Sequence, residues 1–138
     1  MSKRFIWATM ALMLCACCPR AFAMSSVRDV TRQSQAALGL NYTLVADRVD
    51  AEAVLVRMEI ARTGKLKDLR SVSMRIGPGR PILAATLQTT RGKNDSWVVS
   101  FQLSPDLASK CSIDLIVPTN VSYQVYAVEL KGYVTDRK

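Results

Sequence analysis

The chain has 138 residues, enough for one domain, with 19 basic residues, 11 acidic residues and no histidine. The lack of histidine excludes Ser-His and Cys-His nucleophile pairs and removes the commonest general base and transition-metal ligand. The composition therefore disfavours most hydrolases and zinc proteins.

The first 23 residues have the three-part plan of a secretory signal peptide. Lys3 and Arg4 form a basic start, Phe5 to Cys18 is an uncharged apolar run, and Ala21-Phe22-Ala23 supplies the small residues of a cleavage site. The apolar run is short for a membrane span, so an uncleaved anchor is the less favoured alternative. The sequence predicts export to the periplasm or the extracellular space, with Met24 as the first mature residue and no transmembrane segment in the mature form.

A second processing route is open, because Leu14-Cys15-Ala16-Cys17 resembles the lipobox of bacterial lipoproteins. That route would give a membrane-tethered protein, lipid-anchored through Cys17. With cleavage after Ala23, Cys111 is the one cysteine left, so the mature chain forms no internal disulfide. The leader also carries three of the 19 basic residues, and its loss lowers the net charge from +8 to +5.

Residues 24–39 are predicted to be a short helix or a flexible leader segment. Ser26-Val27-Arg28-Asp29 resembles a capping box, and Gly39 is suited to end a helix. The apolar face between them is thin, which leaves both interpretations open.

From residue 40 to residue 138 the apolar residues alternate with polar ones, the period of a half-buried β-strand. The strongest example is Ser96 to Leu103, where Trp97, Val99 and Phe101 share one face. Turn residues fill the gaps between strands, and Ser104-Pro105-Asp106 is a helix-start signal. The domain is predicted to be all-β, a small antiparallel two-sheet β-sandwich of immunoglobulin-like type with about seven strands; a small barrel is the alternative.

The last predicted strand runs from Val121 to about Tyr133. A long strand at a free sheet edge is able to pair with a strand of a partner. This is one predicted route to a protein–protein contact.

A basic segment supplies the candidate binding residues Arg62, Lys65, Lys67 and Arg70, which lie in or beside one predicted turn. Such a patch favours an acidic protein, an anionic lipid or a polysaccharide. Aromatic residues are not interleaved with it, so nucleic acid is not expected. The alternative is a basic hairpin that is merely solvated.

Asp47, Asp50 and Glu52 crowd one loop and are the densest carboxylate group in the chain. Carboxylates of this kind bind calcium or serve a carboxylate-based hydrolase acting on glycans, but they are also common in solvated turns. Cys111 shares a strand face with apolar residues, which predicts a buried thiol rather than a redox or dimer-linking cysteine. The sequence assigns no catalytic residue, cofactor or metal.

All three asparagines, Asn41, Asn94 and Asn120, lie in N-x-S/T sequons. These are glycan acceptors in a eukaryotic secretory protein and ordinary turn residues elsewhere. The combined features predict an exported, non-enzymatic binding or assembly module of the cell envelope or extracellular space that contacts a protein through a sheet edge or loops. The alternatives are a membrane-tethered lipoprotein, a chaperone-like assembly factor and a glycan-directed hydrolase.

Overall fold

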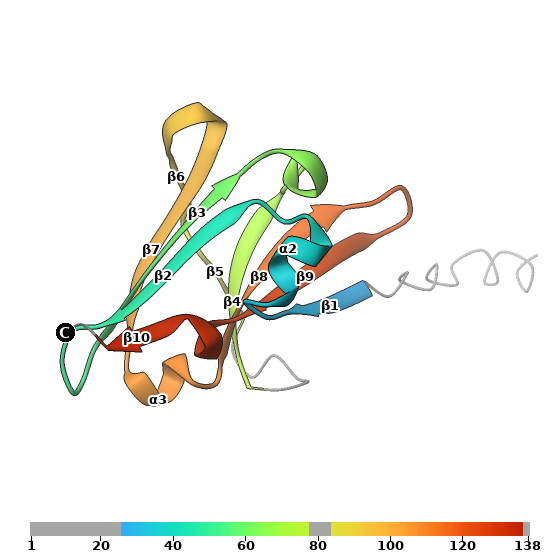
Figure 1. The fold of residues 1–138 in the computed structure, drawn as a ribbon. Helices are drawn as coiled ribbons and strands as arrows, with labels where there is room; N and C mark the ends of the chain where they lie inside the picture. Colours follow the sequence, from blue (N-terminus) through green and yellow to red (C-terminus); the bar gives the residue numbers. More distant parts are fainter. Residues whose placement is uncertain (1–25, 78–83, 137–138) are drawn as a thin grey trace, which may run out of the picture.

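The computed structural model describes residues 26–77 and 84–136, which form two β-sheets packed face to face (Figure 1). The elements in chain order are β1 (Ser26–Val30), α2 (Ser34–Leu38), β2 (Tyr42–Arg48), β3 (Val54–Ala61), η2 (Gly64–Leu66), β4 (Ser71–Ile76), β5 (Ala84–Thr86), β6 (Thr90–Arg91), η3 (Lys93–Asp95), β7 (Ser96–Leu103), α3 (Pro105–Ala108), β8 (Cys111–Pro118), β9 (Tyr123–Glu129), η4 (Leu130–Tyr133) and β10 (Val134–Asp136), where η marks a 3-10 helix. The predicted signal peptide and the possible lipobox lie outside the described residues.

One sheet, here sheet A, has the strand order β1-β9-β8-β4-β5, and the other, sheet B, has the order β10-β2-β3-β7-β6. The predicted all-β sandwich is confirmed; its immunoglobulin-like type stays a prediction. The described residues form ten strands rather than about seven, and both sheets are mixed rather than purely antiparallel. β1 pairs in parallel with β9, and β10 pairs in parallel with β2. Each parallel pair joins segments far apart in the chain, so no local turn signal announces it.

The core lies between the two sheets and follows the predicted alternation. Met58 and Ile60 of β3 and Ile113 and Leu115 of β8 are completely buried and project from the inner faces. β7 pairs with β3 along its whole length, with Val99 in the core and Trp97 partly buried against it. Burial of these side chains is the main force that holds the two sheets together.

The segment between residues 26 and 39 combines a strand with a short helix. The expected capping box at Ser26 is wrong: residues 26–30 form β1, because the free side of β9 offers them a ladder of backbone partners. The helix begins later, at Ser34, and ends as expected at Gly39, whose φ of 67° is the left-handed conformation that glycine tolerates best.

The last long strand does not lie at a sheet edge, which corrects the predicted edge contact. β9 is flanked by β1 on one side and β8 on the other, and the chain then turns through η4 into the three-residue strand β10. Backbone pairing by β1 could not be foreseen from the sequence of β9.

A buried polar cluster fastens α2 to sheet B. The hydroxyl oxygens of Tyr42 and Tyr133 are 2.8 Å apart, and the Tyr133 hydroxyl donates to Oε1 of Gln35 at 3.2 Å. The amide of Gln35 in turn donates to the backbone oxygens of Tyr42 at 2.6 Å and of Leu40 at 3.3 Å. Burial and the Tyr133 contact raise the pKa of Tyr42 far above its ordinary value of 10.0, so the phenol stays neutral.

Candidate binding site at the basic end of the sandwich

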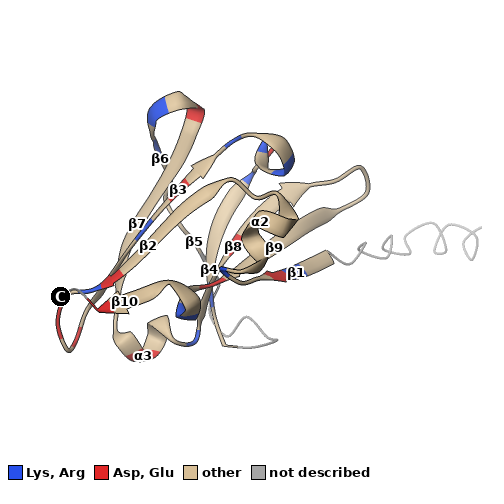
Figure 2. Ribbon diagram, viewed as in Figure 1, with Lys and Arg blue, Asp and Glu red and all other residues tan. Residues whose placement is uncertain are grey.

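Two loops from different parts of sheet B meet at one end of the sandwich. Ala61, the last residue of β3, pairs with Ser96, the first residue of β7, so the loops that continue from them lie side by side. We call these loops, residues 62–70 and 91–95, the basic end; Figure 2 shows their blue segments at the top of the molecule. They carry six cations and two carboxylates: Arg62, Lys65, Lys67, Arg70, Arg91 and Lys93 against Asp68 and Asp95.

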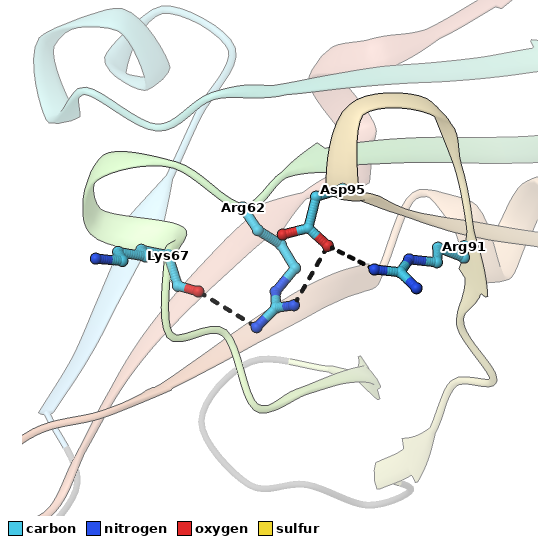
Figure 3. A network of polar contacts seen from close by, with 4 residues as sticks. All are labelled: Arg62, Lys67, Arg91 and Asp95. Atoms are coloured by element: carbon cyan, nitrogen blue, oxygen red, sulfur yellow. Dashed lines mark hydrogen bonds and ion pairs between the residues drawn. The ribbon is translucent and has the colours of Figure 1, made fainter.

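Arg62 ties the two loops together and is therefore largely occupied. Its guanidinium lies 3.7 Å from Oδ1 of Asp95 and donates to the backbone oxygen of Lys67 at 3.4 Å (Figure 3). It also sits 4.9 Å from the ring centre of Trp97. Arg91 reaches the same Asp95 oxygen at 3.5 Å. The Arg62 side chain is 28% exposed. Its main role is therefore to hold the two loops together, and little of its charge is open to a partner.

Arg70 is held in a similar way at the border with sheet A. Its guanidinium lies 5.8 Å from the ring centre of Tyr123 and donates to the Tyr123 hydroxyl at 3.3 Å. The Arg70 backbone amide donates to Ile116 at 2.9 Å, which joins the loop to β8. Arg70 remains exposed, so one face of its charge is open to solvent.

The two lysines of the first loop are the free charges. Lys65 and Lys67 are exposed, and among the described residues their ammonium groups have no ion-pair partner. Between them Leu66 is completely buried, and Leu69 is buried just beyond. These two buried leucines fix the backbone of the loop, so the lysine side chains project from an ordered turn.

The second loop adds cations that the sequence analysis did not assign to the site. Lys93 is exposed and has no ion-pair partner in the described part of the chain. Asn94 and Asp95, which follow it, have positive φ angles of 54° and 57° and form a tight turn. Lys93 lies far from Lys65 along the chain, and the β3–β7 register alone brings them to one end.

The three sequons gather at the same end. Asn41 precedes β2, Asn94 lies in η3, and Asn120 lies in the β8–β9 hairpin, and all three residues are exposed. The Asn41 amide donates weakly to the Thr63 hydroxyl at 3.4 Å, beside the first basic loop. Glycosylation stays a prediction, and the basic end is the surface that glycans would crowd.

The carboxylates predicted for calcium or hydrolysis lie at the opposite end, where Asp50 bonds within its own loop and Asp47 bonds to β10. Oδ1 of Asp50 accepts the backbone amide of Glu52 at 2.7 Å, and Asp47 accepts the Thr135 hydroxyl at 3.2 Å. Asp50 and Glu52 are exposed. The described ranges contain no group of three or more histidine, cysteine or acidic side chains placed to hold a metal ion. The geometry is that of a solvated turn.

Cys111 is buried, in agreement with its prediction as an apolar thiol. Burial, with a smaller effect of Asp114, raises its pKa from 9.0 to about 11, so the unreactive protonated form persists at neutral pH. Arg75 contacts Asp114 through Nε at 3.3 Å, while burial raises the pKa of that carboxyl. Cys111 and Arg75 border a surface pocket of about 700 Å³ that is lined by both signs of charge, including Asp29, Lys110, Glu129 and Lys131.

Comparison with protein-family models, curated proteins and solved structures finds no match. Within residues 26–77 and 84–136, no helix has the length and apolar character needed to cross a membrane.

Proposed function

We propose that this protein is an exported, non-enzymatic binding or assembly module of the cell envelope or extracellular space, and that its basic end engages an acidic protein partner. The observation that carries the proposal is the group of free ammonium charges of Lys65, Lys67 and Lys93 on two neighbouring loops, the first of which is anchored by buried leucines. An anchored cationic surface attracts a complementary acidic surface and loses little conformational entropy on binding.

Charge reversal of Lys65→Glu with Lys67→Glu tests this surface. Binding to polyglutamate, used as an acidic polypeptide, is expected to weaken by at least about tenfold, and the salt dependence of the remaining binding to flatten. The fold should survive, since exposed surface changes usually cost within about 0.5 kcal/mol. Circular dichroism and thermal unfolding check that point.

The matched control is Lys110→Glu with Lys131→Glu, which changes the net charge equally but at the other end of sheet A. Both lysines are exposed, and this control should bind polyglutamate almost as the wild type does. Equal losses in both variants would mean that net charge, not the basic end, governs binding. Vesicles containing phosphatidylserine and the sulfated polysaccharide heparin, tested in parallel, separate an acidic protein from the lipid and polysaccharide alternatives.

Export is tested by the intact mass of the protein recovered from the producing cells. The proposal expects a chain beginning at Met24. A chain beginning at an acylated Cys17 would instead identify the membrane-tethered form, and an unprocessed chain in the cytoplasm would refute export.

A further inference from the structure

β1 is the edge strand of sheet A, and it is weakly integrated into the core. Four of its five residues are exposed, whereas Val30 is completely buried. It pairs in parallel with β9, and parallel pairs are slightly less stable per residue than antiparallel ones. Figure 1 shows β1 lying along the outside of β9 at the border of the sheet.

The register explains why β1 contributes so little to the core. The core-facing residues of β9 are Gln124, Tyr126 and Val128, which pair across the sheet with the buried positions of β8. Their partners in β1 are Ser26, Arg28 and Val30. Two of the three core-facing positions of β1 are thus polar, and Val30 alone fills the interior.

β9 nevertheless needs a strand at this edge. Its seven residues, Tyr-Gln-Val-Tyr-Ala-Val-Glu, are rich in aromatic and β-branched side chains, and Ala127 and Val128 are buried in the present pairing. An uncovered edge of this composition readily pairs with another strand. β1 covers it, and the exposed charges of Arg28 and Asp29 discourage further strands from adding to β1 itself.

The connection between β1 and α2 is a short turn. Between Thr31 and Ser34 the chain reverses through local hydrogen bonds, including Thr31 amide to Ser34 hydroxyl at 2.9 Å. Immediately beyond, Gln35 is fixed to Tyr42 and Tyr133 by the buried polar cluster. Because α2 is held by contacts of its own, β1 can leave β9 without displacing α2, at the cost of its five register pairs and of the burial of Val30.

We propose that the edge of β9 that pairs with β1 is a strand-acceptor site, and that β1 of a second copy of this chain can occupy it in place of the chain's own β1. The structure itself supplies the template for this occupant, because Ser26–Val30 fits the edge through five register pairs and fills the core with Val30. The same segment from a second copy makes the same contacts, and reciprocal exchange closes as a two-fold dimer. The exchange does not involve the basic end, so it stands apart from the proposed function.

Disulfide trapping between singly substituted chains tests the exchange. Val27→Cys in one chain and Val125→Cys in another introduce thiols at residues that pair between β1 and β9. Both chains also carry Cys111→Val, Cys15→Ser, Cys17→Ser and Cys18→Ser, which remove the native thiols. The two are mixed at high concentration in mild urea to speed opening, returned to buffer and treated with diamide.

The expected result is a disulfide between position 27 of one chain and position 125 of the other, with a yield that rises with protein concentration. A mixture of Val27→Cys with Val45→Cys, an exposed position of sheet B, measures accidental collision. At least about a tenfold excess of the 27–125 link over this control supports exchange.

A chain that carries both Val27→Cys and Val125→Cys shows whether β1 lies on β9 of its own chain. If this double variant forms its internal disulfide efficiently while the 27–125 link between chains stays at the control level, β1 lies on β9 without exchanging, and the proposal is overturned. Failure of the double variant to close would also overturn it, because β1 would not occupy the acceptor edge at all. Tryptic mapping of the linked peptides distinguishes these results.

Discussion

Replacing Tyr133 with phenylalanine should destabilise the fold more than replacing Tyr42, although the two phenols touch each other. The Tyr133 hydroxyl serves both Tyr42, at 2.8 Å, and Oε1 of Gln35, at 3.2 Å, whereas the Tyr42 hydroxyl has the Tyr133 contact. Both residues are buried, at 6% and 7% exposure. A buried polar group left without a partner costs about 1–3 kcal/mol, so we expect about 2 kcal/mol for Tyr133→Phe and about 1 kcal/mol for Tyr42→Phe.

The double variant should lose about 2 kcal/mol of unfolding free energy rather than the sum of the two single losses. The Tyr42→Phe change removes the same hydroxyl that Tyr133→Phe alone leaves without a partner. Urea unfolding with an unchanged m-value measures each free energy. Tyr123→Phe, which removes an exposed hydroxyl bonded to Arg70, is the control and should change stability by less than about 0.5 kcal/mol. Additive costs, or a larger cost for Tyr42→Phe than for Tyr133→Phe, would refute the network as described.

Three further perturbations probe the turns and the buried thiol. Gly92→Ala should destabilise by about 1–3 kcal/mol in urea unfolding, because the added Cβ would collide with the Ser96 hydroxyl and lie 2.9 Å from a Val98 methyl; an unchanged midpoint would contradict this. Gly39→Ala should cost about 1 kcal/mol through its positive φ alone, since the space around it is open, and Gly39→Asn should cost less, as thermal unfolding of the pair would show. The Cys111 thiol has its pKa raised from 9.0 to about 11, so its contribution to stability is complete below pH 9 and is lost as the pH rises from about 9 to 11. Unfolding free energies of the wild type and of Cys111→Val should diverge across that range, and parallel curves would refute the assignment.

The position of the binding charges illustrates the limit of local sequence reasoning. Arg62, Lys65, Lys67 and Arg70 were recognisable because they crowd one turn of the chain. The different roles of these four residues could not be predicted from the sequence, because the contacts of Arg62 with Asp95 and Trp97 join residues more than 30 positions apart. Lys93 was missed for the same reason, because only the pairing of β3 with β7 brings its loop to the same end of the sandwich as the loop of Lys65.

The sequence by itself determined the all-β character, the inward faces of β3, β7 and β8, the helix start at Ser104 and the helix end at Gly39. These features depend on a period of two residues, on a cap hydroxyl that accepts the Leu107 amide, and on the φ freedom of glycine, all of which act within a few residues. Tertiary structure alone decided that residues 26–30 become a strand and that β9 lies inside its sheet. Ser26–Val30 carries a weak local preference, and the backbone hydrogen bonds that fix it come from residues 124–128 at the far end of the chain. Such pairing energy depends on which edge is left open after the core has formed, and no local pattern encodes that.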